Sequence, residues 1–502
     1  MAHAIRAQLR QNAEARRGQD FTVQVFPLVD SQQGPHHPQS SNDELSHDQE
    51  IGGNAALVDL ATLDETDNFF ITLYLDTVFP SLFPWYQPAT LSGGRSWLLA
   101  VLRANKAFFH TAMSLSSYYF TLVLARDASH TIRTPCEQHV WDSLAMHMNL
   151  SIQVIRQHTD DLNIGQVKSN VIHQTHVLGG IVQLLVLETS IAGETDWNSH
   201  LTAALVLLDD IFQAHGMRDG RCNLASILDA MQRSSIFDGM SLGFPVWNAD
   251  QAAFQFFTAL LIYADIMSSI LLRSSPRLRH CHRDLVVGHD LCSNLIGGTQ
   301  PLLQMENYIG CHGWVLVIIS EISELGLWKR SARPEEGGCA AEEFMRRTRE
   351  LEDKLKKGSK YITEPSELME TTNHAPNGVL ATRIWIYAAT MYLILVKEGW
   401  KSGGHTMRDN VESVLNLFQL LPPQTYLRSL IWPFCVSGLL ATTEQEQAFR
   451  KLISDLGPLR AFGATKEAVQ LMERVWQRRE QLDDSWGLAD CFEIQGCKIL
   501  LI

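Results

Sequence analysis

Residues 239–243 read Gly-Met-Ser-Leu-Gly and match the G-x-S-x-G pattern of a nucleophile elbow, in which a serine hydroxyl attacks an acyl group. That chemistry requires Ser241 to lie on a sharp turn that leads from a buried strand into a helix. The preceding residues, 227–237, are instead typical of a helix, and Pro245 follows almost at once. We therefore interpret the motif as a loop and predict no catalytic serine.

Histidine and cysteine residues at short spacing are the next candidates, because imidazole and thiolate groups bind zinc. His173 and His176 are one helical turn apart, and residues 280–282 read His-Cys-His. No spacing in the sequence fixes the further ligands that a four-coordinate zinc site needs. From these residues we predict no metal site and identify no cofactor-binding residue.

The His-Cys-His segment lies in the most basic part of the predicted helical body. Its arginines are Arg273, Arg277, Arg279 and Arg283. Such a run could contact phosphate or an acidic partner. A solvated loop between two helices has the same composition, and that is the interpretation we favour.

Residues 209–213 read Asp-Asp-Ile-Phe-Gln and resemble the magnesium-binding DDxxD/E segment of terpene synthases. The resemblance implies an all-helical enzyme whose carboxylates hold Mg²⁺ against a diphosphate. The third acid is missing, and the family's second pattern, N-D-x-x-S-x-x-x-E, is matched only by residues 42–50, upstream of the first. We predict no enzyme and keep this one as an alternative, with Asp209 and Asp210 as the acids to test.

Apolar residues recur with helical spacing along most of the chain. The predicted helices cover residues 69–83, 97–124, 137–162, 166–191, 201–214, 224–231, 252–272, 285–296, 314–328, 342–357, 379–398 and 407–421. Strictly alternating runs joined by an Asn-Gly or Asp-Gly turn, the signal of a β-hairpin, are not found. The sequence predicts an all-α fold, a large array of packed antiparallel helix pairs.

Residues 430–476 predict the last helix pair. Thr443 and Glu446 have the spacing of a capping box, Gly457 and Pro458 end the first helix, and Thr465 can cap the second. The two tryptophans of this segment, Trp432 and Trp476, lie within apolar patterns. We predict that both indoles serve packing.

Two apolar stretches could be mistaken for membrane spans. Residues 384–396 are too few to cross a bilayer as a helix. Residues 252–272 are numerous enough, but Gln255 and Asp265 lie within them, and a carboxylate in the bilayer is costly. We predict no membrane association.

The first 58 residues differ in composition from the rest. Residues 27–54 are rich in Pro, Gln, Ser, His and acids, a composition that cannot bury enough apolar surface to order itself. Four arginines precede them without the apolar run of a secretory signal. We predict a basic arm with a disordered linker over residues 1–58 and one helical domain over residues 59–502.

Charge and cysteine usage restrict the class of protein. The formal net charge is −14, which repels the phosphate backbone of DNA. The nine cysteines are odd in number and contain no C-x-x-C pair. We predict reduced thiols in a nuclear or cytosolic protein.

The order of features over residues 59–502 resembles the fungal-specific transcription factor domain, the helical regulatory region of fungal zinc-cluster regulators, particularly of the acriflavine-sensitivity-control type. The stretches that carry the resemblance are Phe69–Phe83, the helix from Trp97, Trp314–Trp328 with its ISELGLW ending, Leu430–Pro433 with Gly438, and Leu471–Trp476. Family members usually begin with six cysteines that bind two zinc ions and read DNA. The first cysteine here is Cys136, inside the helical part, so no zinc ligand or DNA-reading residue carries over.

The resemblance implies a nuclear transcriptional regulator that acts through its helical domain and does not read DNA by itself. The expected partners are a zinc-cluster transcription factor or a second copy of the chain, and a small-molecule effector could bind among the helices. Besides the magnesium-dependent enzyme, one alternative stays open: a truncated zinc-cluster transcription factor whose missing exon encodes the cluster.

Overall fold

A computed structural model of the chain divides into two units, residues 1–57 and 58–502. The described residues all lie in the second unit. They are 58, 63–90, 93–124, 135–163, 170–191, 197–232, 246–287, 303–331, 337–363, 376–400, 404–422, 426–494 and 499–502. The predicted arm and linker therefore lie outside the described residues, and the division of the chain into an arm and a domain stays a prediction.

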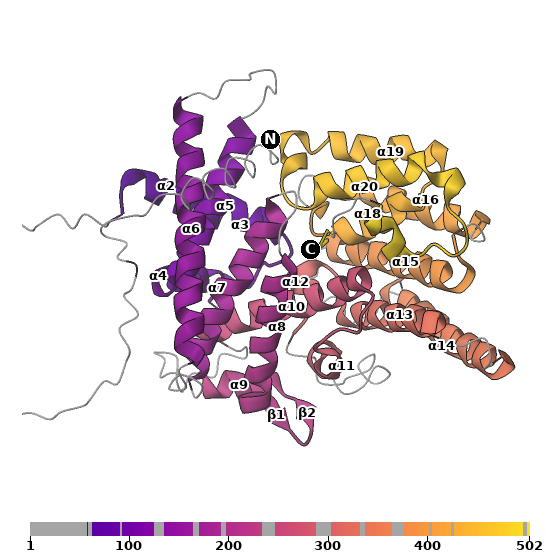
Figure 1. Ribbon diagram of the computed structural model, residues 1–502, viewed down its shortest axis with the longest axis horizontal. Coiled ribbons are helices and arrows are strands. Elements are labelled where there is room, and N and C mark those ends of the chain that lie inside the picture. Colours follow the sequence, from indigo (N-terminus) through magenta and orange to yellow (C-terminus); the bar gives the residue numbers. More distant parts are fainter. Residues whose placement is uncertain are drawn as a thin grey trace, which may run out of the picture. The chain divides into compact units, whose positions relative to one another are not determined.

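The elements of the first half of the described chain are helices and one short hairpin (Figure 1). Its elements are α2 (Glu65–Leu73), η2 (Tyr74–Val78), α3 (Phe79–Leu82), α4 (Ser96–Ala104), α5 (Lys106–Leu124), α6 (Pro135–Asn163), α7 (Val171–Ser190), α8 (Trp197–Ile211), η4 (Phe212–Gly216), β1 (Met217–Arg218), β2 (Arg221–Cys222) and α9 (Leu224–Ala230).

The elements of the second half of the described chain are all helices. Its elements are α10 (Ala249–Leu272), α11 (Arg279–Val286), α12 (Glu306–Ile309), α13 (Gly313–Ser331), α14 (Gly337–Thr363), α15 (Pro376–Glu398), α16 (Gly404–Leu420), α18 (Ile431–Leu439), α19 (Thr443–Ser454), η8 (Gly457–Ala461), α20 (Thr465–Gln477), η9 (Arg479–Gln481) and α21 (Leu488–Glu493). The predicted all-α class is confirmed. The helix predicted over residues 285–296 instead ends at Val286, and residues 288–302 lie outside the described part.

Helices that follow one another in sequence pack as pairs. Contacts join α5 to α6, α7 to α8, α13 to α14 and α15 to α16. α10 lies against several of them, because α4, α7, α8, α13 and α21 all contact it. Its residues are buried around almost the whole helix, as expected of a helix that is apolar on every side.

An aromatic cluster joins the first helices to α10. The ring of Phe256 lies 5.4 Å from that of Phe79, 5.0 Å from Tyr86 and 5.3 Å from Trp97, between ring centroids. Trp97 also donates from its Nε1 to the Tyr86 hydroxyl at 2.9 Å. Edge and tilted contacts of this kind add to the stability gained from burying the rings. The predicted aromatic entry helix thus packs on the central helix.

The predicted helix over residues 97–124 is two helices, because the chain breaks at Asn105. Its backbone is extended, with φ −126° and ψ 101°. The side-chain oxygen accepts from the Phe108 backbone N–H at 3.1 Å, which caps the start of α5, and Nδ2 donates to the His176 carbonyl at 2.6 Å. An asparagine is favoured at such a cap. The apolar periodicity continues on both sides of Asn105, and for that reason the sequence pattern does not show the boundary.

Pro80 does not stop the first aromatic helix. A proline has no N–H and its ring collides with the carbonyl one turn back in an α-helix. The chain widens into the π-helix η2 over the preceding residues, where Phe79 N donates to the Tyr74 carbonyl. The helix then resumes as α3 and ends before Phe83.

The hairpin is an element that the sequence analysis missed. Met217 pairs with Cys222, and the strands turn at Asp219 and Gly220, whose φ angles are 52° and 74°. An Asp-Gly dipeptide suits such a turn because both of its residues tolerate positive φ. Each strand has only two residues, which is too short for an alternating pattern to stand out, so the sequence does not predict this hairpin.

The last helix pair is present, with its caps shifted. The cap of α19 is Thr442, not Thr443, and Gln445 replaces Glu446 as its partner: Gln445 Oε1 accepts from the Thr442 backbone N–H at 3.0 Å. Thr465 is the first residue of α20 and does not cap it. The cap shifts by one residue because Thr442 and Thr443 both offer a hydroxyl, and Gln445 and Glu446 both offer a side-chain oxygen.

Both tryptophans predicted for packing are buried. Trp432 stacks on Trp385 with ring centroids 5.3 Å apart and an 8° angle between the planes. Trp476 donates from Nε1 to the Gly438 carbonyl at 2.8 Å, which ties α20 to α18. The prediction that these indoles serve packing is confirmed.

Three of the described helices, α7, α10 and α15, are long and apolar enough to cross a membrane by length and composition. The predicted apolar stretch, residues 384–396, is too short to cross a bilayer, but the helix that contains it, α15, extends beyond both of its ends and is long enough. Within the protein these helices pack on neighbours, and 94% of the most apolar window of α10 is buried. The corresponding windows of α7 and α15 are 78% and 61% buried.

Candidate functional site

Two sequence candidates cannot be placed. The Gly-Met-Ser-Leu-Gly motif at 239–243 and the acidic pattern at 42–50 lie outside the described residues. Asp209 and Asp210 are described, in the last turn of α8. Asp209 Oδ1 lies 3.3 Å from His280 Nε2 and accepts from Gln213 Nε2 at 3.5 Å. Asp209 thus contacts a histidine, and a glutamine stands where a third acid would be expected.

The two histidines of α7 have separate surroundings. His176 Nε2 lies 2.8 Å from Asp250 Oδ1, at the start of α10. His173 is half-buried one turn earlier. Among the described residues, the acids and cysteines near this pair do not converge into a group that could hold a metal ion. The contact with Asp250 instead fastens α7 to α10.

The basic run around α11 is partly neutralised within the protein. Arg273 bonds to Asp490 and lies 3.3 Å from Glu493, so it joins the end of α10 to α21. Arg279 Nε lies 2.5 Å from Glu324 Oε1 on α13. These arginines serve contacts between helices, and a free phosphate would have to compete with two carboxylates for Arg273 and with one for Arg279.

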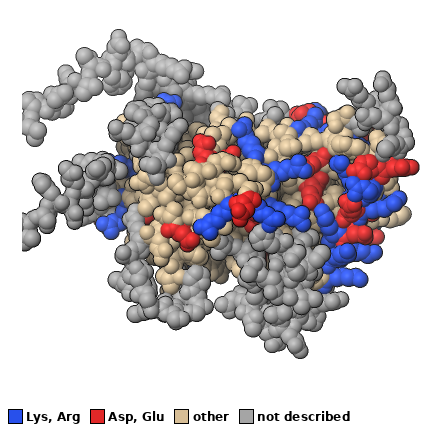
Figure 2. Space-filling model, turned by 90° about the horizontal axis from the view of Figure 1, so that it is seen from below, with Lys and Arg blue, Asp and Glu red and all other residues tan. Residues whose placement is uncertain are grey.

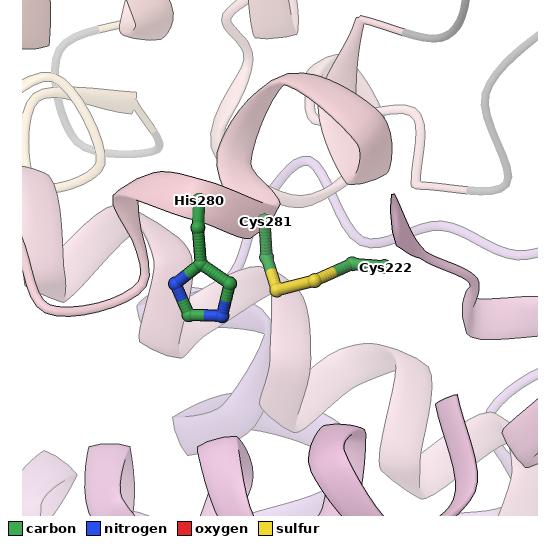
Figure 3. A group of neighbouring side chains, drawn as sticks. All are labelled: Cys222, His280 and Cys281. Atoms are coloured by element: carbon green, nitrogen blue, oxygen red, sulfur yellow. A yellow bond between two sulfur atoms is a disulfide. The ribbon is translucent and has the colours of Figure 1, made fainter. Parts of the chain in front are cut away.

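His280, Cys281 and His282 point to different partners although they are consecutive. His282 Nε2 lies 3.1 Å from Asp265 Oδ2 in the core. Cys281 forms a disulfide with Cys222 of the hairpin, 59 residues away in sequence. Figure 3 shows the imidazole of His280 beside the Cys281 sulfur, with Cys222 beyond it. Cys222, His280 and Cys281 form a cluster of possible metal ligands, which we call the Cys222 cluster.

The prediction of reduced cysteines is therefore wrong for one pair and right for three others. Cys311, Cys435 and Cys491 are free and buried. Burial raises the pKa of each of these three thiols. They therefore stay protonated and are poor nucleophiles. Cys222 carried no local signal, since no other cysteine lies near it in sequence; only the folding of the hairpin onto α11 brings it to Cys281.

A groove of about 560 Å³ lies between α14, α15 and α16. Its cationic lining residues are Lys356, Lys360, Arg383 and Lys397, with Glu352 and Glu398 at the same groove. Lys397 Nζ donates to Glu352 Oε1 at 2.9 Å, which bridges α15 and α14. The volume falls in the range of small-molecule pockets, whereas the many charges are less typical of them.

The surface along α14 carries interspersed charges of both signs. Figure 2 shows Lys and Arg mixed with Asp and Glu at the end of the molecule where α14 lies. Within α14, Glu343 accepts from both Arg346 and Arg347, and these bonds lower the pKa of its carboxyl to about 2. Exposed pairs of this kind contribute little to stability.

Comparison with known proteins identifies a family and several similar proteins. Residues 68–502 match the family described as fungal specific transcription factor domain. Transcription factor dibT of Pestalotiopsis microspora is 33% identical over 449 residues, which cover 86% of this chain and 70% of that protein. Pestheic acid cluster transcriptional regulator 3 of Pestalotiopsis fici is 26% identical, over 88% of this chain and 76% of its own length.

A third relative is the trichothecene biosynthesis transcription regulator TRI10 of Trichoderma arundinaceum, 26% identical over 82% of this chain and 91% of that protein. No solved structure matches the chain. The family match covers most of the chain and begins at the aromatic entry helix, and the stretches that carry the sequence resemblance all lie within it. The chain belongs to the fungal-specific transcription factor domain family.

Proposed function

We propose that this protein regulates transcription of a biosynthetic gene cluster in the nucleus, through contacts of its helical domain with other proteins. The family match over residues 68–502 carries the regulatory part of the proposal. The relatives support the cluster part, because two of them are named for pestheic acid and trichothecene biosynthesis. The nuclear site of action follows from the role in transcription.

A deletion and a tethering experiment test the regulatory role together. We expect deletion of the gene to change the transcript levels of biosynthetic genes at the same locus several-fold. The full chain fused to a heterologous DNA-binding domain should change a reporter relative to that domain alone at equal protein level. Unchanged transcripts and an unchanged reporter would contradict the proposal.

We further propose that a partner supplies the reading of DNA. The net charge of −14 supports this, because it opposes approach to a phosphate backbone. Two arginines of the most basic described run are also held by carboxylates. A zinc-cluster transcription factor and a second copy of this chain are the candidate partners. Tight binding of the purified chain alone to a specific DNA site at physiological salt would contradict this part.

The magnesium-dependent enzyme gains no support from α8, because Asp209 contacts His280 and the third acid position is Gln213. We propose that the protein has no catalytic role. A direct assay checks this against prenyl diphosphate substrates with Mg²⁺. Release of diphosphate by the wild type, lost in Asp209→Ala, would favour the enzyme instead.

A further inference from the structure

The Cys222 cluster brings together three groups of the kind that bind zinc. One sulfur or nitrogen from each of Cys222, His280 and Cys281 can be chosen so that all three lie within 4.8 Å of one another. Cys222 lies on β2, and His280 and Cys281 lie on α11. The two elements are far apart in sequence, but their side chains meet in the fold (Figure 3). The described chain offers no other group of three such residues.

We propose that Cys222, Cys281 and His280 bind a Zn²⁺ ion when the two cysteines are reduced, with Asp209 as the fourth ligand. Two thiolates, an imidazole and a carboxylate form a donor set that zinc accepts. The Zn–N and Zn–O bonds of such sites are both close to 2.05 Å, so tetrahedral neighbours lie about 3.3 Å apart. His280 Nε2 and Asp209 Oδ1 are 3.3 Å apart, whereas Asp209 is not a member of the group whose atoms all lie within 4.8 Å, so its carboxylate has to turn toward the two sulfurs to complete the site.

The elements that carry the ligands are held in place by bonds that do not involve the sulfurs. Asp284 Oδ2 accepts from the Cys222 backbone N–H at 3.2 Å and ties β2 to α11. His282 contacts Asp265 at 3.1 Å and fixes the other side of α11 to the core. Opening the disulfide therefore leaves the two cysteines close together, ready to bind an ion.

Burial of the ligands fits a site that an ion enters from one side. Cys222 is 6% exposed and Cys281 is fully buried. The side chains of His280 and Asp209 are 43% and 40% exposed, so the imidazole and the carboxylate face the solvent. The ion would reach the thiolates past these two side chains.

The disulfide and the zinc site use the same two sulfurs and exclude each other. A cellular dithiol gives two electrons and two protons to the Cys222–Cys281 bond, which yields two thiols and the disulfide of the reductant. Zinc then replaces both thiol protons, which pass to the solvent, and forms two Zn–S bonds. Transcription regulators work in compartments that keep thiols reduced, where paired cysteines are more often metal ligands than disulfides.

Zinc titration of the reduced full chain tests the proposal. The protein is reduced with a phosphine, its thiols are counted, and Zn²⁺ is added in competition with a chromophoric chelator. We expect one tightly held ion per chain in the wild type and its loss in the Cys222→Ser, Cys281→Ser double variant. Co²⁺ in place of zinc should give tetrahedral visible bands and thiolate-to-cobalt charge transfer, both absent in the double variant.

Matched variants separate the ligands from their neighbours. His280→Gln and Asp209→Asn should each weaken zinc binding by about tenfold or more, a typical loss for a group that holds or orients a metal. Asp210→Asn, the exposed neighbour of Asp209, and Cys435→Ala, a buried free cysteine, should leave the affinity unchanged. Circular dichroism confirms that each variant is folded.

Three results would overturn the zinc site. The first is a fully reduced wild type that holds no ion. The second is a double variant that holds zinc as tightly as the wild type. The third is binding that Asp210→Asn weakens as much as Asp209→Asn, because this would indicate general attraction of the ion to acids. Reporter activity is not the readout, so failure here leaves the proposed regulatory role untouched.

Discussion

Asp265 shows what a single charged residue does inside an apolar helix. It is 2% exposed, in the middle of α10. Its two oxygens accept from the backbone N–H groups of Arg277 and Leu278, at 2.9 and 2.8 Å, and contact His282 Nε2. The carboxylate thus caps the start of the segment that leads into α11. In the sequence, Asp265 is evidence against a membrane span; in the fold, it holds the turn that leads into α11.

We expect Asp265→Ala to lower the free energy of unfolding by about 3 kcal/mol or more. The substitution leaves two buried backbone N–H groups and an imidazole without their acceptor, and each such loss costs about 1–3 kcal/mol. Urea unfolding followed by circular dichroism measures the change. The exposed Asp210→Ala is the control and should stay within about 0.5 kcal/mol. Equal midpoints for the two variants would contradict the role given to Asp265.

A second residue-scale feature is a pair of facing histidines. His110 Nδ1 lies 2.9 Å from His147 Nδ1, where α5 packs on α6. One ring nitrogen must donate and the other accept, so the pair cannot hold a proton on both facing nitrogens. Burial, the neighbouring His147 and Lys106 lower the pKa of His110 from its ordinary value of 6.5 to about 4.

This pair predicts loss of stability in mild acid. The folded pKa of His110 lies below the unfolded one, so the unfolded chain binds more protons between pH 6.5 and about 4. The stability that the neutral His110 side chain contributes is fully present above pH 6.5 and is lost as the pH falls toward 4. After allowance for partial exposure, it amounts to about 1–2 kcal/mol.

Urea unfolding of the wild type and of His110→Gln between pH 7.5 and pH 4 measures this loss. The variant should lose less stability than the wild type over that range, because it has no imidazole to protonate at that position. His405→Gln, at an exposed position in α16, serves as the control and should follow the wild type. A wild type and a His110→Gln variant with the same pH dependence would show that the pair does not titrate in this range.

At the scale of elements, the positions of the helices depend on a few close approaches. Gly313 begins α13, and a Cβ there would overlap the carbonyl oxygen of Val286, at the end of α11. The backbone oxygen cannot move aside without shifting α11. Contact between the two helices therefore requires glycine at this position. The helical pattern around Gly313 does not predict this requirement.

We expect Gly313→Ala to lower the free energy of unfolding by about 1–3 kcal/mol, the usual cost of overpacking. Gly378→Ala is the matched change, in the first turn of α15, where an added Cβ meets no atom within 4 Å. It should be neutral or stabilising by up to about 1 kcal/mol, because alanine favours a helix. Thermal unfolding of both variants gives the comparison, and similar midpoints would mean that α13 does not pack on α11 as described.

At the scale of the whole molecule, the end of the chain returns to the central helix. Ile499, Leu500 and Leu501 are buried, and the Tyr263 hydroxyl of α10 donates to the Leu501 carbonyl at 3.1 Å. α21, just before them, is joined to the end of α10 by Arg273 and Asp490. Segments separated by more than two hundred residues therefore stabilise each other, and the fold depends on its last residues.

Removal of residues 499–502 should destabilise the protein by about 5 kcal/mol, because burial of each of the three apolar side chains contributes about 1.5–3 kcal/mol. Urea unfolding of the shortened and full chains measures this. A chain that lacks Ile502 alone should stay close to the wild type, because that side chain is only partly buried. A shortened chain with unchanged stability would contradict the docking of the terminus on α10.

The sequence by itself determined the class of the fold, since the signals of a helix are local. Apolar spacing over three or four residues predicted the helices and the burial of Trp432 and Trp476, and these expectations were confirmed. The errors were local as well. Asn105 as a cap, the π-helix before Pro80 and the turn at Asp219 each depend on side-chain or backbone bonds that periodicity does not report.

The tertiary structure alone decided how the candidate residues combine. The sequence offered Asp209 and His280 as members of two unrelated motifs and gave Cys222 no role. The fold brings Asp209 to 3.3 Å from His280, and Cys222 to Cys281 across 59 residues. Such meetings depend on how α8, the hairpin and α11 pack, and the energy of that packing is spread over many distant contacts. For that reason a pattern read along the chain predicts a helix, but it cannot assemble a site.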